Sequence, residues 1–212
     1  MNNNKNNIEV LKDVNFENLE ILNLGWNKII NINILEYVNF KELKELTLYN
    51  NDISDIKVLE KVKFDKLEKL SLGCNNISDI KILKNVNFKK LIELDLSNNK
   101  ISDLTILGEA KFEKLEILNL GGNNILDINI LEYVNFKELK ELTLNNNNIS
   151  DIKVLEKVKF EKLEKLNLAT NKITDINILE YVNFKELKKL NLFNNTISDI
   201  NVLDKVQFKV LM

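Results

Sequence analysis

Hydrophobic positions along the chain follow two alternating periodicities. One short stretch places leucines two residues apart, as in Leu46 and Leu48, which is the spacing of one face of a β-strand. The next stretch places apolar residues three apart, as in Ile56, Leu59 and Val62, which is typical of one face of a short helix. Because the two stretches recur in turn, the pattern predicts strands that alternate with short helices.

This alternation repeats every 24 residues. Each unit carries the frame L-x-x-L-x-L-x-x-N, first at Leu19, Leu22, Leu24 and Asn27. The frame closes each time on an asparagine, and these are Asn27, Asn51, Asn75, Asn99, Asn123, Asn147, Asn171 and Asn195. A period in this range indicates a solenoid, in which stacked units bury one continuous core. We expect a parallel sheet, because every unit repeats the same path.

The repeat divides the chain into three segments. Residues 1–7 are Asn-rich and expected to be flexible, and residues 8–18 match the helical half of a unit and predict an N-terminal capping half-repeat. Residues 19–212 hold eight 24-residue repeats and a truncated ninth. Because no L-x-L follows Leu211, we expect either a fragment of a longer repeat protein or self-association through the C-terminal edge of the eighth strand.

Three columns of the repeat are predicted to serve the fold. The amide of each frame asparagine can satisfy backbone groups that a turn leaves unpaired. An acidic column stands where each helix begins and is predicted to cap the helices rather than to bind calcium: Asp55, Asp79, Asp103, Asp127, Asp151, Asp175 and Asp199. An aromatic column is predicted to form a core spine: Phe16, Phe40, Phe64, Phe88, Phe112, Phe136, Phe160, Phe184 and Phe208.

The repeated frame resembles that of the leucine-rich-repeat family over residues 8–212. The stretch Asn76-Ile77-Ser78-Asp79-Ile80, followed by Leu83, is similar to the repeats of bacterial internalins and of the leucine-rich regulatory subunit of protein phosphatase 1. Both families use shorter units than this chain. The resemblance implies an α/β solenoid shaped as a horseshoe or arc, with a concave parallel β-sheet and short convex helices. It also implies a general role in binding.

Composition excludes several classes of function. The chain has 212 residues and a net charge of -2, and all 30 basic residues are lysines, which argues against nucleic acid and against an anionic membrane surface. It has no histidine and a single cysteine, Cys74, so a Cys–His catalytic pair and a Cys/His zinc site are excluded. No catalytic motif is present. We expect a cytoplasmic protein that is not an enzyme and needs no cofactor or metal.

Surface charges alternate in sign along the stack. One column reads Glu20, Lys44, Glu68, Ile92, Glu116, Lys140, Glu164 and Lys188, and a second reads Lys41, Asp65, Lys89, Glu113, Lys137 and Glu161. Neighbouring strands of a sheet lie about 4.8 Å apart, so each charge is expected to stand beside opposite charges. Such ladders are predicted to cancel their own field and to serve the structure.

Candidate binding residues flank the strand leucines on the predicted concave face. The columns that begin at Gly25 and Trp26 vary most between units, while the core positions do not. Trp26 and Tyr49 stand on adjacent units and are predicted to anchor a partner, because aromatic side chains often dominate interfaces; the alternative is that Trp26 packs on the N-terminal cap. Asp95 and Phe193 complete the predicted partner-binding set.

These observations support a protein–protein interaction scaffold that binds another protein on its concave sheet. Two alternatives remain open from the resemblance. One is a regulatory subunit that docks on an enzyme such as a protein phosphatase, and the other is an internalin-like surface adhesin. Similarity of fold does not choose among them.

Overall fold

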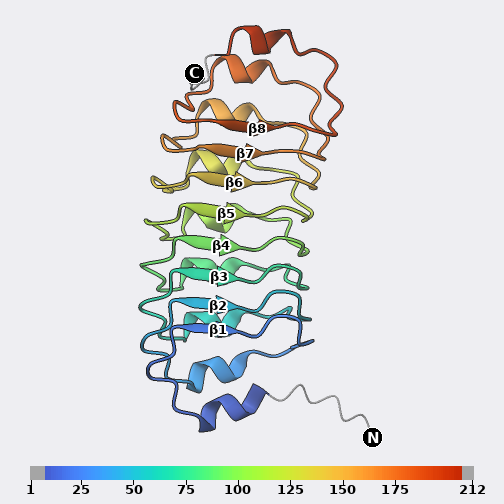
Figure 1. Ribbon diagram of the computed structural model, residues 1–212. Helices are drawn as coiled ribbons and strands as arrows, with labels where there is room; N and C mark the ends of the chain where they lie inside the picture. The colour runs from blue at the N-terminus through green and yellow to red at the C-terminus, as the bar shows by residue number, and fades with distance from the viewer. Residues whose placement is uncertain (1–7, 207–212) are drawn as a thin grey trace, which may run out of the picture.

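The computed structural model describes residues 8–206, which form one stack of similar coils (Figure 1). Each coil contributes one short strand to a parallel sheet, and the strands are ordered along the sheet as they are along the chain. They are β1 (Ile21–Asn23), β2 (Glu45–Thr47), β3 (Lys69–Ser71), β4 (Glu93–Asp95), β5 (Ile117–Asn119), β6 (Glu141–Thr143), β7 (Lys165–Asn167) and β8 (Lys189–Asn191). The predicted parallel solenoid is therefore confirmed.

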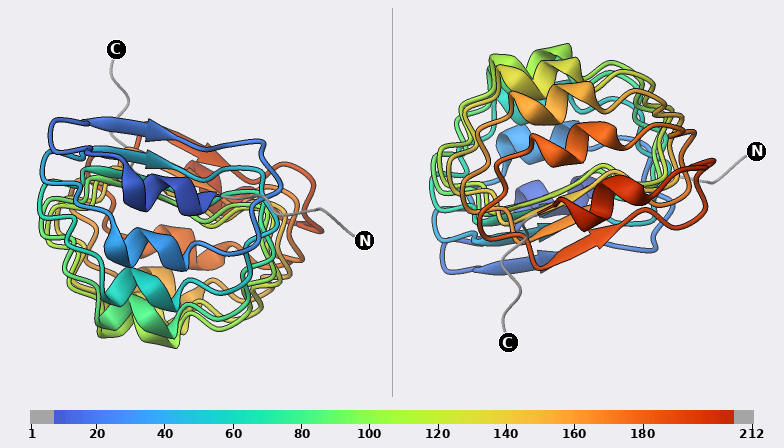
Figure 2. Two further views of the ribbon diagram at one scale, coloured as in Figure 1. Left: turned by 90° about the horizontal axis from the view of Figure 1, so that it is seen from below. Right: turned by 90° about the horizontal axis from the view of Figure 1, so that it is seen from above.

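Register is set by the leucines. Leu22 pairs with Leu46, and Leu46 with Leu70, so each strand is displaced from the next by one whole repeat. A slip of one residue would turn the leucines outward, which is why the register is strongly specified. Viewed along the stack, the middle coils are displaced toward the helices relative to both ends (Figure 2). The sheet therefore lies on the inner, concave side of an arc.

Short helices cover the other side of the core. They are 3₁₀-helices of four to six residues: η1 (Ile8–Asp13), η2 (Asn33–Tyr37), η3 (Lys57–Glu60), η4 (Lys81–Lys84), η5 (Thr105–Gly108), η6 (Asn129–Glu132), η7 (Lys153–Glu156), η8 (Asn177–Glu180) and η9 (Asn201–Asp204). The predicted helical span is too long, because Ile56 and Val62 flank η3 rather than belong to it. Their spacing of three matches the 3.0-residue turn of a 3₁₀-helix.

The core is a set of continuous apolar columns. Leu46, Leu48 and Ile53 of the second unit are fully buried, and their counterparts in the middle units are buried too. The predicted phenylalanine spine is confirmed within the described residues, since Phe40 and Phe64 are buried with ring centroids 5.8 Å apart. Each unit is thus covered by its two neighbours, and no single unit could bury these side chains alone.

A second ladder runs through the turns after the strands. The Nδ2 of Asn99 donates to the carbonyls of Leu72 and Leu96 at 3.0 and 3.1 Å, and its Oδ1 accepts the Ile77 N–H at 2.9 Å. The same bonds recur in the middle units. The predicted structural role of the asparagine column is confirmed, because each buried amide satisfies backbone groups of its own unit and of the unit before it.

At the N-terminal end of the stack, η1 lies against η2 (Figure 1). Leu11 is buried there, and the ring centroid of Phe16 lies 5.6 Å from that of Phe40. This is the segment for which the sequence predicts a capping half-repeat. Phe208, Leu211 and residues 1–7 lie outside the described residues, so the predicted flexible terminus and truncated ninth repeat lie there too.

Candidate functional site

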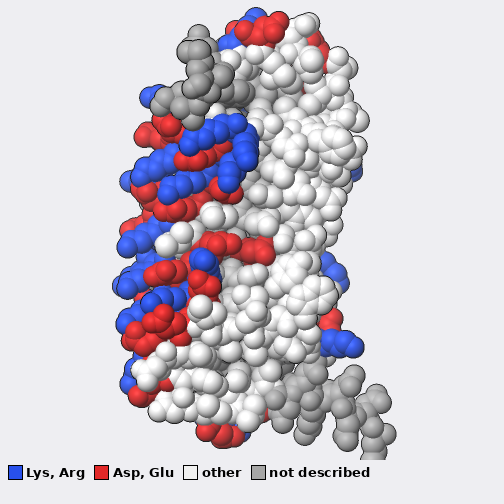
Figure 3. Space-filling model, in the orientation of Figure 1, with Lys and Arg blue, Asp and Glu red and all other residues white. Residues whose placement is uncertain are grey.

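The concave sheet face is divided lengthwise into two halves of different chemistry (Figure 3). Lysines and acidic residues crowd the side on which the strands begin, which we call the charged half. The side on which the strands end, which we call the uncharged half, consists of three columns. The first column is Asn23, Thr47, Ser71, Asp95, Asn119, Thr143, Asn167 and Asn191, and the second is Gly25, Tyr49, Gly73, Ser97, Gly121, Asn145, Ala169 and Phe193. The third column is Trp26, Asn50, Cys74, Asn98, Gly122, Asn146, Thr170 and Asn194. Asp95 is the only charged residue in these three columns.

Trp26 and Tyr49 form an aromatic pair at the N-terminal end of the uncharged half. Their ring centroids lie 6.1 Å apart at an interplanar angle of 50°. Trp26 is held by its backbone, because its N–H donates to the Tyr49 carbonyl at 2.9 Å, while its side chain is 75% exposed. The alternative in which Trp26 packs on the N-terminal cap is therefore not supported, since the indole contacts the Tyr49 ring in a tilted arrangement and faces solvent.

Tyr49 reaches from this pair toward the middle of the face. It is half-buried and lies beside Cys74 of the next unit. A hydrogen bond and an electrostatic interaction with the Cys74 side chain, with smaller effects of burial and of the Asp95 carboxylate, raise the pKa of the Tyr49 hydroxyl above its ordinary value. At neutral pH the hydroxyl is protonated and can donate a hydrogen bond.

Gly73 permits this approach. A Cβ atom at Gly73 would lie 2.7 Å from Oδ2 of Asp95, 2.9 Å from Oγ of Ser97 and 3.0 Å from Cδ2 of Tyr49. Distances this short are clashes, so any side chain at this position would push the tyrosine ring and the carboxylate apart. Tyr49 and Asp95 thus converge on one point of the face, although the unit that contains Gly73 lies between their own two units.

Asp95 is positioned by its neighbours without being neutralised. Its Oδ2 accepts the Ser71 hydroxyl at 3.1 Å, and its Oδ1 accepts the Ser97 N–H at 3.0 Å. The side chain is half-buried. Two polar neighbours fix the carboxylate while its negative charge remains available to a ligand, since an ionised carboxylate offers about four acceptor sites.

Phe193 stands apart from this cluster. It follows β8 at the far end of the face, its side chain is 75% exposed, and its N–H donates to Oδ1 of Asn191 at 3.1 Å. Four strand spacings separate its unit from that of Asp95, or about 19 Å. The structure therefore brings together Trp26, Tyr49 and Asp95 and leaves Phe193 as a separate exposed aromatic.

The sequence analysis did not identify Ser71, Gly73 and Cys74 as neighbours of the candidate binding residues. All three belong to the unit between those of Tyr49 and Asp95. A comparison of successive units across neighbouring columns, rather than down one column, would have found them. Each column taken alone shows only small residues at these positions.

Salt bridges in the charged half link each unit to the next. The predicted alternation is confirmed for Glu20–Lys44 at 2.8 Å, Glu116–Lys140 at 2.7 Å and Glu164–Lys188 at 2.9 Å. Further pairs that the sequence did not single out are Glu42–Lys66, Glu45–Lys69, Glu138–Lys162 and Glu141–Lys165. Hydrogen bonds from the lysines lower the pKa of their partners Glu42, Glu138 and Glu164.

The second predicted charge ladder forms ion pairs only in part. Lys41 pairs at 3.0 Å with Glu17, which stands 24 residues earlier in the same column. Among the described residues, no ion pair joins two of the column members from Lys41 to Glu161.

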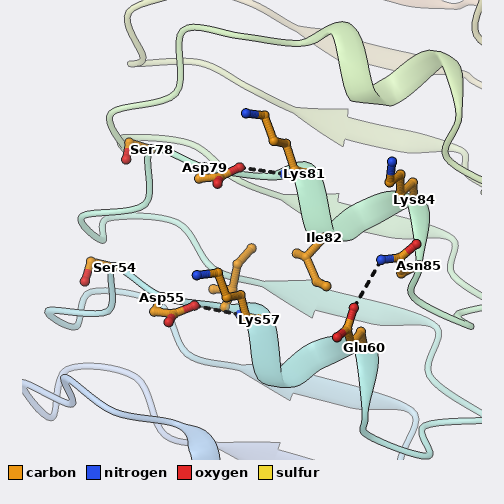
Figure 4. A pocket seen from close by; sticks show the side chains of 11 residues that line it. Ser54, Asp55, Lys57, Glu60, Ser78, Asp79, Lys81, Ile82, Lys84 and Asn85 are labelled. Atoms are coloured by element: carbon orange, nitrogen blue, oxygen red, sulfur yellow. Dashed lines mark hydrogen bonds between the residues drawn. The ribbon is translucent and has the colours of Figure 1, made fainter.

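A hollow of about 630 Å³ opens on the helix side between η3 and η4 (Figure 4). Its polar groups bond one another: Asp55 and Asp79 each accept the N–H of a lysine two residues ahead at 2.9 Å, and Glu60 accepts Nδ2 of Asn85 at 3.1 Å. A similar hollow lies between η7 and η8. Because the hollow recurs with the stack, we assign it to the spacing of the units rather than to a ligand.

The acidic column bonds the start of each helix as predicted, but from one residue before the N-cap, which is Ile56 in η3. From Asp55 to Asp199, each carboxylate accepts the backbone N–H two residues ahead, at 2.7 to 2.9 Å. In residues 8–206 no group of three or more Cys, Asp or Glu side chains is arranged to hold a metal ion. In the same residues, no helix combines the length and the apolar character needed to cross a membrane.

Comparison with known proteins gives one family. A family model described as "Leucine Rich repeats (2 copies)" matches residues 41–85, 89–133, 137–181 and 161–205, which is more than half of the chain. A search of curated protein sequences finds no significant match.

Solved structures with the same fold are numerous. Internalin C2 from Listeria monocytogenes is 27% identical with a TM-score of 0.74, and the match covers 88% of this chain and 76% of that one. The ectodomain of a plant membrane receptor kinase from Arabidopsis thaliana, in complex with CASPARIAN STRIP INTEGRITY FACTOR 2, is 26% identical with a TM-score of 0.65, over 84% of this chain and 22% of the receptor. A Leptospira interrogans protein, at 23% identity and a TM-score of 0.56, shares the fold over 89% of this chain and 58% of its own.

Proposed function

Because the chain belongs to the leucine-rich-repeat family, we propose that it is a binding scaffold, without catalytic activity, that holds another protein on the uncharged half of its concave sheet. The observation that carries the proposal is the cluster of Trp26, Tyr49 and Asp95. It joins two aromatic rings and a carboxylate on the uncharged half, whose other side chains are neutral and, apart from Phe193, small. Aromatic anchors of this kind dominate the binding energy of protein interfaces.

The fold supports a protein rather than a small molecule as ligand. The sheet face is open along eight strands, whereas small-molecule sites are concave pockets that enclose most of their ligand. The similar plant receptor ectodomain was solved in complex with CASPARIAN STRIP INTEGRITY FACTOR 2. Phe193, at the other end of the face, is placed to contact a partner long enough to span the stack.

A second candidate is an internalin-like role at a cell surface, which the similarity to internalin C2 favours. It differs from the cytoplasmic scaffold in location, not in the binding face. Protease treatment of intact source cells separates the two: the surface role predicts that an antibody epitope on this chain is lost, and the cytoplasmic role that it survives. Self-association through the β8 edge also stays a prediction, which solution mass over a concentration series would check.

Affinity capture with matched variants tests the proposed face. The double variant Trp26→Ala, Tyr49→Ala is expected to lose the partner, because each truncated anchor costs about 1–3 kcal/mol of binding free energy. The control is Tyr133→Ala, Tyr181→Ala, which removes two exposed aromatic side chains from the helix side. Circular dichroism should show that both variants are folded. Equal capture by wild type and the Trp26 and Tyr49 variant would refute the proposed face.

A further inference from the structure

The ion-pair ladders of the charged half are interrupted at its middle. In the column of Glu45, Lys69 pairs with Glu45 at 3.1 Å, and Glu141 pairs with Lys165 in the same way. Between these pairs stands Glu93, whose neighbours in register are Lys69 on β3, which is ion-paired to Glu45, and Ile117 on β5. Among the described residues no ion pair involves Glu93. This column, which the sequence did not single out, is therefore interrupted at β4.

Asp95 extends this unpaired charge onto the uncharged half. Glu93 and Asp95 flank the buried Leu94 on β4, so both point to the open face. Residues two apart in a strand are separated by about 6.6 Å. Figure 3 shows acidic side chains reaching from the charged half into the white surface at the level that β4 and β5 have in Figure 1. Lys69 lies beside Glu93 in register but pairs with Glu45, so among the described residues neither carboxylate of β4 has a lysine at ion-pair distance.

An aromatic ring borders the same place. The Gly73 geometry puts Cδ2 of Tyr49 and Oδ2 of Asp95 within 3.0 and 2.7 Å of one point. A cationic side chain that lies above that point, over the face of the tyrosine ring, would meet the carboxylate and the ring at once. Ion pairing and cation–π attraction then act on the same group, and each is stronger where the site is partly desolvated.

We propose that the segment bound on this face is basic and extended, with one lysine or arginine on Asp95 beside Tyr49 and a second, two residues along, on Glu93. The spacing follows from the strand, since side chains two apart in an extended peptide have the same separation as Glu93 and Asp95. The proposal rests on the proposed function, because it names the chemistry of the partner bound at that site.

An acidic partner is the competing possibility. Lys66, Lys90 and Lys114 follow one another in one column of the charged half, and only Lys66 has an ion pair among the described residues, with Glu42 at 2.6 Å. These lysines lie before the strands, away from Trp26 and Tyr49. The one charge of the uncharged half is negative, so the observations favour the basic segment.

Short peptides test the chemistry directly on the full chain. The probe is acetyl-Ala-Lys-Ala-Lys-Ala-amide, and its controls carry Gln or Glu in place of both lysines, or the two lysines side by side. Binding is followed by the fluorescence of Trp26, the single tryptophan of the chain, and by NMR shifts. The Lys-x-Lys peptide is expected to bind about tenfold more tightly than the Gln peptide at low salt, and to lose that preference as salt rises.

Matched variants locate the effect. Asp95→Asn with Glu93→Gln should remove the preference for the Lys-x-Lys peptide, whereas Glu141→Gln, in the same column as Glu93 but ion-paired to Lys165, should keep it. Equal affinity for the Lys and Gln peptides, or tighter binding of the Glu peptide, overturns the inference. If either peptide result is obtained while partner capture still depends on Trp26 and Tyr49, only the basic-segment inference is overturned. The proposed function then stands.

Discussion

At the scale of single residues, the turn after each strand holds a residue in the left-handed region three positions after the strand ends, and the first turn holds a second one, Lys28. Trp26, Cys74 and Thr170 have φ values of 62°, 53° and 54°. This conformation costs a residue other than glycine about 1–2 kcal/mol. The bonds around it offset the cost, since the Cys74 N–H donates to the Ser97 carbonyl at 2.8 Å and the next residue, Asn75, bonds the turn. The side chain at the left-handed position then points away from the core and is free to vary.

The asparagine that follows this turn is the residue whose loss the fold should tolerate least. In Asn123→Ala the carbonyls of Leu96 and Leu120 lose their Nδ2 donor, and the Ile101 N–H loses its acceptor. Because these groups are buried, we expect a loss of about 3 kcal/mol of unfolding free energy, measured by urea denaturation. The control is Asn124→Ala, which truncates the exposed neighbour and should change stability little. Equal effects of the two substitutions would contradict the ladder.

At the scale of elements, each unit consists of a three-residue strand and a single helical turn. Neither element is stable alone, because such short segments fix more backbone freedom than they recover in hydrogen bonds. Each one forms because its neighbours in the stack repeat it, as η3 does between η2 and η4. The start of each helix is the point at which a local contact, the aspartate cap, still contributes.

The cap gives a prediction at this scale. Asp55→Ala removes the acceptor of the Lys57 N–H, which now lies 2.9 Å from Oδ1, and should lower the unfolding free energy by about 0.5–1 kcal/mol. Urea denaturation against Asp52→Ala measures the effect. Asp52 is exposed and its carboxylate accepts no hydrogen bond among the described residues, so the same substitution there should be neutral. A loss as large in Asp52→Ala would assign the effect to charge instead of capping.

At the scale of the whole molecule, inter-unit ion pairs line one edge of the sheet for most of its length. The pairs are exposed, so each contributes little, and their number matters more than any one of them. The opposite edge carries a single charged residue in its three columns, Asp95. The binding cluster therefore stands on the side of the sheet that the ion pairs do not occupy.

The ladders predict a stability plateau with two edges. Lysine hydrogen bonds lower the pKa of Glu42, Glu138 and Glu164 below 4.5, so their contribution is present above pH 4.5 and is lost as pH falls through the lowered values. Hydrogen bonds to glutamates raise the pKa of Lys44, Lys69 and Lys140 above 10.5, so their contribution is complete below pH 10.5 and is lost as pH rises through the raised values.

Urea denaturation across pH checks this plateau. Glu138→Gln should reduce the fall in stability on the acid side, because the lowered pKa of Glu138 is part of that fall. The control is Glu113→Gln, which removes a carboxylate that forms no ion pair among the described residues. If the unfolding free energy of wild type and of Glu138→Gln falls identically as pH is lowered, the Glu138–Lys162 pair does not contribute to stability.

The sequence by itself determined the solenoid, the parallel register and the core. A repeated frame leaves no freedom here, because every unit must bury the same columns against its neighbours, and only one register does so for Leu22, Leu46 and Leu70 together. The asparagine ladder and the aspartate caps were predictable for the same reason, since each follows from one position repeated in every unit.

Only the tertiary structure decided which side chains of different columns meet. Tyr49 reaches Asp95 because Gly73, in the unit between, leaves the space open, and Trp26 contacts Tyr49 because a left-handed turn aims its side chain outward. Likewise Glu93 lacks an ion pair because Lys69, its neighbour on β3, pairs with Glu45, and its neighbour on β5 is Ile117. The sequence period determines the core positions, because they repeat in every unit. The candidate site lies where residues differ from unit to unit, and the contacts of such residues depend on side-chain size and backbone direction in three dimensions.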